Sequence, residues 1–240
     1  MKFNNFKEIG NQKLTELLTH KHIVIDRRSW LYATLIARCP EQLARQAVEQ
    51  TPAAARIDVA LLDNLAAAII KEHIYKTTSV SFATTLPPPP FDFILIATDI
   101  ANYYINALWL CQKLAYLYGW GDVRQQADPT EPNLQLLYLL CIFVGINPEE
   151  ENMLALVKHI YTSVGEKYKG KNIRKKFAYY SVNRLFKILS RRLGKKPLGQ
   201  VLAKALWILG GAISAYYTYK SFSEQANRFQ QILKDKSTNA

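Results

Sequence analysis

Apolar residues recur at helical spacing along nearly the whole chain, and little of the sequence alternates as a half-buried strand would. Thr51 and Pro52 suit the N-cap and first residue of a long alanine-rich helix. The stretch 77–85 is rich in β-branched residues and serine, but no breaker precedes it, so we read it as a continuation of that helix. The pattern predicts helices over residues 6–18, 27–38, 40–50, 52–75, 91–118, 133–146, 149–164, 173–193 and 198–233.

Four consecutive prolines, Pro87 to Pro90, separate two long apolar helices. Proline lacks an amide hydrogen and clashes with the preceding turn, so the run ends one helix and lets the chain reverse before the next. Gly119 and Gly121 provide a C-terminal stop for the second helix. The sequence therefore predicts an all-α fold, a multi-helix bundle built around a long antiparallel helical hairpin, with amphipathic C-terminal helices.

Breaks in the helical pattern divide the chain into three regions. We expect N-terminal helices in 1–50, a helical core with the proline-turn hairpin in 51–164, and a basic C-terminal helical region in 165–240 that packs on the core. A hydrophobic fraction of 49% is ample for a buried core. No signal-peptide pattern opens the sequence, so we expect the protein in the cytoplasm.

The net charge of +12 is distributed unevenly. Residues 1–157 contain 13 Lys and Arg against 16 Asp and Glu, a net of −3, whereas residues 158–240 contain 18 against 3, a net of +15. Such a field attracts phospholipid headgroups or nucleic-acid phosphates. The alternative is a solvated basic face that only aids solubility.

The predicted helix 173–193 combines cations with an apolar stripe that contains Phe177, Leu185 and Ile188, as in helices that lie in an anionic interface. It also fits a core helix with a basic outer face. No known nucleic-acid motif surrounds it, which disfavours nucleic acid as the partner. The residues that we assign to membrane binding are Arg184, Lys187, Arg191, Arg192, Lys195, Lys196 and Trp207.

Three charge-free runs, 77–91, 132–148 and 205–219, each fall short of the roughly 20 residues that a membrane-spanning helix needs. The run 205–219 is the best membrane candidate, because basic residues precede it and three tyrosines stand where an interfacial aromatic belt would lie. An ordinary core helix explains it equally well.

One helix face after the prolines carries a polar stripe in otherwise apolar surroundings. Its members are spaced by about two helical turns, with one residue interleaved: Asp92, Asp99, Asn102, Asn106 and Lys113. A buried carboxylate requires a partner. A tight antiparallel return would place Thr78 and Ser79 near Asp99, Lys71 near Asn106, and Asp63 or Asn64 near Lys113. We interpret the stripe as a structural network; a polar cavity for an ion or headgroup and a solvent-facing stripe stay open.

Common catalytic and metal-binding motifs are missing from the sequence. It contains no His-Glu-x-x-His pair, no Gly-x-Ser-x-Gly elbow, no glycine-rich phosphate loop and no Cys-x-x-Cys. The three cysteines, Cys39, Cys111 and Cys141, lie in apolar helical patterns where cysteine acts as a small hydrophobe. We therefore expect no enzyme activity, no metal site and no cofactor.

Residues 82–90, Phe-Ala-Thr-Thr-Leu-Pro-Pro-Pro-Pro, and residues 112–119, Gln-Lys-Leu-Ala-Tyr-Leu-Tyr-Gly, resemble the EcsC-like family of bacterial proteins. The glycine-rich segment from Gly210 resembles the family more weakly. The sequence departs from the family in having four prolines at the turn, and Asn102 and Asn106 where Gln and often His occur. The resemblance implies a helical fold and membrane association, without an established reaction.

These observations predict a non-enzymatic helical protein that associates peripherally with the cytoplasmic face of the bacterial inner membrane, with an anionic membrane surface as its partner. Two alternatives remain. The protein could be a membrane-perturbing effector or defence component that releases residues 205–219 into lipid. It could also be a soluble adaptor that binds an acidic protein or nucleic acid.

Overall fold

The computed structural model describes residues 17–18, 20–83, 92–123, 133–145 and 207–238, and within these ranges it contains helices and no strand. The predicted all-α fold is confirmed. The elements are the 3₁₀-helix η1 (Lys21–Ile23) and the α-helices α2 (Arg27–Ile36), α3 (Glu41–Glu49), α4 (Val59–Ala83), α5 (Asp92–Leu117), α6 (Leu134–Phe143) and α9 (Trp207–Thr238). The predicted helices 6–18, 149–164 and 173–193 lie wholly or almost wholly outside the described residues.

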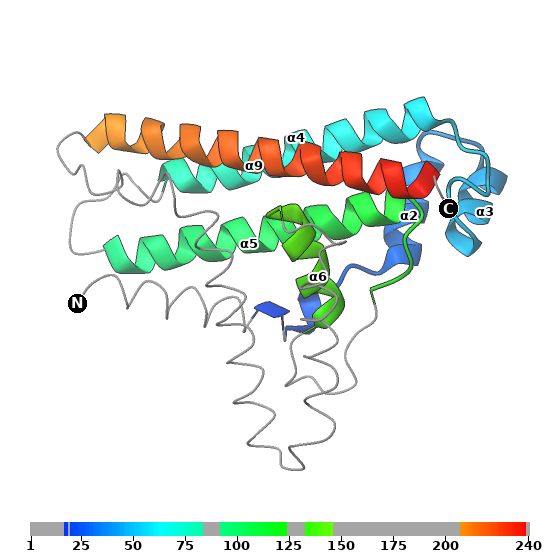
Figure 1. Ribbon diagram of the computed structural model, residues 1–240, viewed down its shortest axis with the longest axis horizontal. Helices are drawn as coiled ribbons and strands as arrows, with labels where there is room; N and C mark the ends of the chain where they lie inside the picture. The colour runs from blue at the N-terminus through cyan, green and yellow to red at the C-terminus, as the bar shows by residue number, and fades with distance from the viewer. Residues whose placement is uncertain (1–16, 19, 84–91, 124–132, 146–206, 239–240) are drawn as a thin grey trace, which may run out of the picture.

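Three long helices, α4, α5 and α9, lie side by side and form the centre of the molecule (Figure 1). α4 and α5 run antiparallel, as predicted for the hairpin. α9 packs along both and runs antiparallel to α4, because Thr218 meets Ser81 near one end of the pair and Lys234 meets Asp63 near the other. α2 and α3 pack together at the end where α4 begins, and α6 packs against α5 and α9.

Local sequence signals set several helix ends. The Asp26 carboxylate accepts the Ser29 backbone N–H at 2.9 Å and caps α2. The Asn133 side chain accepts two backbone N–H groups, from Gln135 at 3.1 Å and Leu136 at 3.2 Å, and caps α6. Gly119 follows α5 with φ +83, a left-handed conformation that glycine adopts without strain, which confirms the predicted stop.

The start of α4 differs from the prediction. Thr51 does accept the Ala54 backbone N–H, at 3.1 Å, but it caps only a short turn. Arg56 then has φ +54, and this left-handed residue interrupts the helical hydrogen bonding. Asp58 accepts the Ala60 N–H at 3.0 Å, so α4 begins at Val59 rather than at Pro52. At its other end α4 continues through residues 77–83, as predicted.

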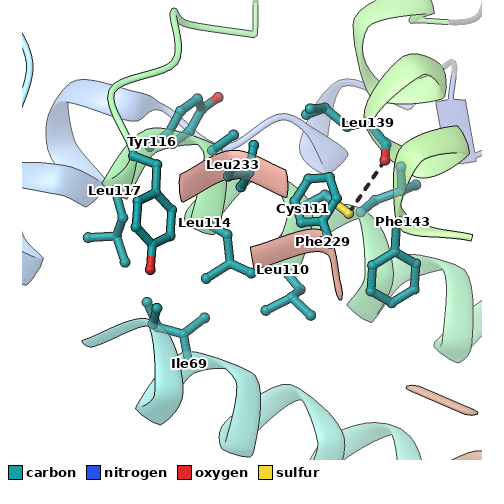
Figure 2. Close-up of a cluster of buried hydrophobic side chains, with 14 of the residues drawn as sticks. Ile69, Leu110, Cys111, Leu114, Tyr116, Leu117, Leu139, Phe143, Phe229 and Leu233 are labelled. Atoms are coloured by element: carbon teal, nitrogen blue, oxygen red, sulfur yellow. Dashed lines mark hydrogen bonds between the residues drawn. The ribbon is translucent and has the colours of Figure 1, made fainter. Parts of the chain in front are cut away.

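The hydrophobic core draws side chains from α4, α5, α6 and α9 (Figure 2). The Phe143 ring of α6 lies edge-on to two rings of α9, with centroids 5.3 Å from Phe222 and 6.2 Å from Phe229. Cys111 and Cys141 are buried in the same core. α9 therefore shares one core with the hairpin. None of the helices in the described part combines the length and the hydropathy that crossing a membrane requires.

Candidate functional site

Polar side chains of α4, α5 and α9 meet between the three helices. On α5 they recur three, four or seven residues apart and on α4 eight residues apart, spacings that keep side chains near one helix face. We call this set the polar seam; its members are His73 and Ser81 of α4, Asp99, Asn102, Asn106 and Lys113 of α5, and Thr218 of α9.

One end of the polar seam joins all three helices through a hydroxyl group. Ser81 donates to Asp99 Oδ2 at 3.1 Å, and its oxygen lies 2.8 Å from the Thr218 hydroxyl. Burial raises the pKa of Asp99 above its ordinary value, and the Ser81 hydrogen bond opposes that shift. The Asp99 carboxyl group therefore bonds to the neutral Ser81 hydroxyl, which in turn contacts Thr218.

The other end of the polar seam is centred on His73, whose side chain is fully buried. Its Nε2 lies 3.0 Å from Lys113 Nζ, and its Nδ1 lies 2.9 Å from Asn106 Oδ1. A lysine ammonium group can only donate, so Nε2 accepts and Nδ1 carries the ring proton. Asn106 Nδ2 then donates to Asn102 Oδ1 and to the Asn102 carbonyl, both at 2.9 Å. These bonds form one directed chain from Lys113 to Asn102.

Burial keeps the histidine in this chain neutral. Burial, together with the nearby Lys113 cation, lowers the pKa of His73 to about 4, although the Asn106 hydrogen bond opposes the shift. Burial also lowers the pKa of Lys113, while the nearby Glu72 carboxylate raises it. Glu72 itself forms an ion pair with Lys76 on the surface. The polar seam thus carries a cation at one end, a carboxylate near the other and neutral groups between them.

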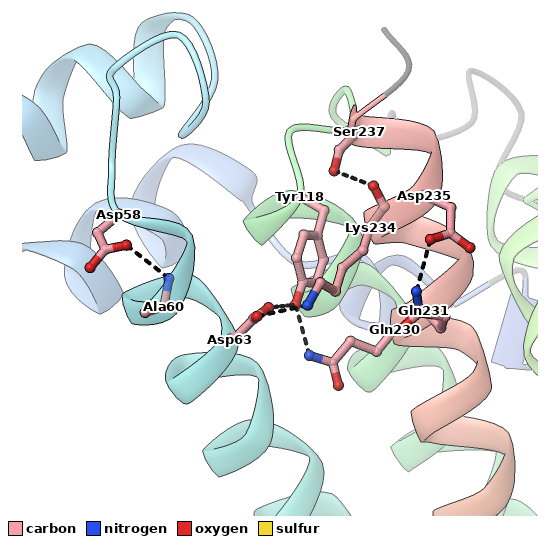
Figure 3. A network of polar contacts seen from close by, with 9 residues as sticks. All are labelled: Asp58, Ala60, Asp63, Tyr118, Gln230, Gln231, Lys234, Asp235 and Ser237. Atoms are coloured by element: carbon pink, nitrogen blue, oxygen red, sulfur yellow. Dashed lines mark hydrogen bonds and ion pairs between the residues drawn. The ribbon is translucent and has the colours of Figure 1, made fainter.

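A second polar network holds the C-terminal part of α9 against the hairpin (Figure 3). Tyr118 donates to Asp63 Oδ1 at 2.8 Å, and Lys234 Nζ lies 2.7 Å from Asp63 Oδ2. Gln230 donates to the Tyr118 hydroxyl at 2.8 Å. This network, the Ser81–Thr218 contact and a hydrogen bond from Tyr103 of α5 to Gln225 attach α9 to the hairpin along its described length.

The structure corrects the predicted partners of the polar stripe. Asp99 binds Ser81 instead of Thr78 or Ser79. Asn106 binds His73 rather than Lys71, which is exposed, and Lys113 contacts His73 rather than Asp63 or Asn64. For Asp99 and Asn106 the pairing is shifted along α4 by two or three residues, because packing along the full length of the helices sets their register. Lys113 differs more, since its partner on α4 lies nine or ten residues beyond the predicted ones.

His73 and Ser81 were missed as site residues, although both are polar positions in an apolar stretch and lie two turns apart on one face of α4. Asp92 begins α5 and Trp207 begins α9, but neither side chain belongs to the described part. The remaining residues assigned to membrane binding also lie outside the described residues: Arg184, Lys187, Arg191, Arg192, Lys195 and Lys196.

The chain matches no protein-family model, no curated protein and no solved structure. The resemblance to the EcsC-like family therefore stays a prediction. Within the described ranges, no three side chains of His, Cys, Asp or Glu form a group that could hold a metal ion. The polar seam links α4 and α5 by hydrogen bonds and reaches α9 through Thr218.

Proposed function

We propose that this chain is a non-enzymatic helical protein that binds the anionic cytoplasmic face of a bacterial membrane through its basic C-terminal region. The distribution of charge carries the proposal. Residues 158–206 contain 14 Lys and Arg and a single Glu, a net of +13, whereas residues 1–157 have a net of −3 and residues 207–240 a net of +2. Nearly all the excess charge thus lies in one segment, which we call the basic segment.

The helical bundle supports the proposal by providing an anchor for the basic segment. The chain passes from this segment directly into α9 at Trp207. α9 is held to the hairpin by Thr218 and Lys234 and by the buried rings of Phe222 and Phe229. Cations attached to a folded bundle at α9 can bring the whole molecule to a membrane surface.

The expected strength of binding follows from the number of cations. Each Lys or Arg near an anionic surface contributes about 1 kcal/mol. Neutralising Arg191, Arg192, Lys195 and Lys196 together should lower partitioning more than tenfold. Dissolved salt should weaken the same attraction, because the Debye length shortens as ionic strength rises.

Cosedimentation with vesicles across a salt series tests the proposal. The protein with Arg191, Arg192, Lys195 and Lys196 replaced by Gln should lose binding to phosphatidylserine-containing vesicles at low salt. A matched control replaces four exposed arginines of the described bundle by Gln and changes the net charge equally: Arg28, Arg38, Arg45 and Arg56. The control should bind like the wild type, and neutral vesicles should bind all three proteins weakly.

Two results would contradict the proposal. If the variant at positions 191, 192, 195 and 196 binds like the wild type at low salt, these residues are not an electrostatic anchor. If the wild type binds no vesicle, a soluble adaptor for an acidic protein or nucleic acid becomes the better reading. A dye-leakage assay on the same vesicles separates peripheral binding from membrane perturbation. Perturbation would require the part of α9 up to Tyr219 to separate from α4 and enter the bilayer.

A further inference from the structure

Three tyrosines stand out on the surface of α4 and α9. Tyr75 is 73% exposed, Tyr216 58% and Tyr219 51%, so these large rings lie mostly in solvent. In the part of the chain that the structure describes, the other exposed large hydrophobic side chains are Ile36 and Val59. Those two lie at the ends of α2 and α4 near the opposite end of the bundle.

The register of α4 and α9 places the tyrosines in one stretch of the helix pair. Thr218 is level with Ser81, so Tyr219 lies level with the residues just before Ser81. Tyr75 precedes Ser81 by six residues, about 9 Å along the helix axis. Lys234 reaches Asp63 of α4, and Tyr216 and Tyr219 precede Lys234 by 18 and 15 residues, about five and four helical turns. Both tyrosines therefore lie on the flank of α9 toward α4.

The charges around these tyrosines suit an anionic surface. Lys71 and Lys220 are exposed and have no ion-pair partner among the described residues. Lys76 is exposed and pairs with Glu72, and Glu224 is an exposed carboxylate one turn beyond Lys220. The local balance is therefore slightly positive, and the stronger attraction comes from the basic segment, which ends where α9 begins.

We infer that the outer surface around Tyr75, Tyr216 and Tyr219, the tyrosine face, is the surface with which the protein lies against an anionic lipid bilayer. Tyrosine suits this position because its ring enters the boundary of the acyl chains while its hydroxyl stays among the headgroups. Lys71 and Lys220 can extend their charged ends to lipid phosphates. The inference rests on the proposed function and names the surface through which that function operates.

Vesicle binding at high salt isolates the contribution of the tyrosine face, because salt screens the basic segment and leaves apolar contacts intact. Replacing Tyr75, Tyr216 and Tyr219 by Ser should lower the residual partitioning about tenfold. The triple Phe variant retains the rings and should bind at least as well as the wild type. The double variant Ile36→Ser and Val59→Ser is the control for exposed apolar residues elsewhere, and it should bind like the wild type.

An environment-sensitive fluorophore reports the orientation directly. Cys39→Ser leaves Cys111 and Cys141, which are buried and unreactive in the folded protein. In that background Tyr219→Cys places the probe on the tyrosine face, and Val59→Cys places it near the other end of α4. Anionic vesicles should shift the emission at position 219 to the blue and leave the emission at position 59 unchanged.

The outcomes separate this inference from the proposed function. If the Ser variant binds like the wild type and the probe at position 219 does not respond, the tyrosine face is not the docking surface. The proposed function survives that result provided that the Gln variant at positions 191, 192, 195 and 196 still loses binding. If the wild type binds no anionic vesicle, the proposed function fails and the inference fails with it.

Discussion

The buried side chain of His73 makes the stability of the protein depend on pH. Its pKa is about 4 in the folded protein against 6.5 for a free histidine. Between these two values the unfolded chain binds more protons than the folded one, so stability falls as pH drops from about 6.5 toward 4. A shift of this size corresponds to a loss of up to about 3 kcal/mol over that window.

His73→Gln is expected to remove this part of the pH dependence. The variant should be less stable than the wild type at pH 7, because the contact with Lys113 is disturbed, and the difference should narrow by pH 4.5. Urea denaturation of both proteins at pH 7 and at pH 4.5 measures this difference in the free energy of unfolding. His22→Gln alters an exposed histidine and should keep the wild-type pH dependence. An unchanged pH dependence in His73→Gln would show that the buried imidazole does not control acid sensitivity.

The sequence predicted part of the polar seam at this scale. Asp99, Asn102, Asn106 and Lys113 could be found because helical spacing alone places them on one face. The residues of α4 that contact them could not be found in this way. A shift of two or three residues between neighbouring helices is enough to make the partners Ser81 and His73 instead of Ser79 and Lys71. That register depends on distant contacts such as Tyr118 with Asp63, which no local pattern encodes.

At the scale of elements, α9 belongs to the core as fully as the hairpin does. Phe222, Phe229 and Leu233 are completely buried, and Phe143 of α6 packs against the first two. Helix ends were predictable where a cap or a glycine marks them, as at Gly119. The start of α4 could not be predicted from the sequence, because Arg56 adopts a left-handed conformation that is uncommon for residues other than glycine.

Phe229→Ala is expected to destabilise the protein by about 3–5 kcal/mol, the usual cost of removing a buried phenylalanine ring. Tyr216→Ala removes an exposed ring of the same helix and should change stability by less than about 0.5 kcal/mol. Chemical denaturation of both variants, followed by circular dichroism, makes the comparison. Similar, small effects of the two substitutions would mean that α9 is not packed into the core.

For the molecule as a whole, three cysteines provide natural probes of cooperative unfolding. Cys111 lies on α5 and Cys141 on α6, both buried, whereas Cys39 is half-buried near α2. Burial also raises the pKa of Cys141 to about 12 and that of Cys111 well above its ordinary value, so neither thiol ionises readily in the folded protein.

A thiol reagent such as DTNB should therefore modify Cys39 first. Cys111 and Cys141 should react together, at the rate at which the core opens, and Phe229→Ala should accelerate both equally. Mass spectrometry of the labelled peptides over time assigns each rate. Much faster labelling of Cys141 than of Cys111 would show that α6 opens without the rest of the core.

The contacts of α9 also determine when the bundle can close during folding. Ser81 and Asp99 are 18 residues apart along the chain, whereas Ser81 and Thr218 are 137 apart. Loop-closure entropy makes the longer contact about 2 kcal/mol more costly to form. α4 and α5 can therefore pair early, while the apolar surface that Phe222 and Phe229 will cover stays open until more than a hundred further residues have been synthesised. During that interval the nascent hairpin presents an aggregation-prone face, the situation in which molecular chaperones act.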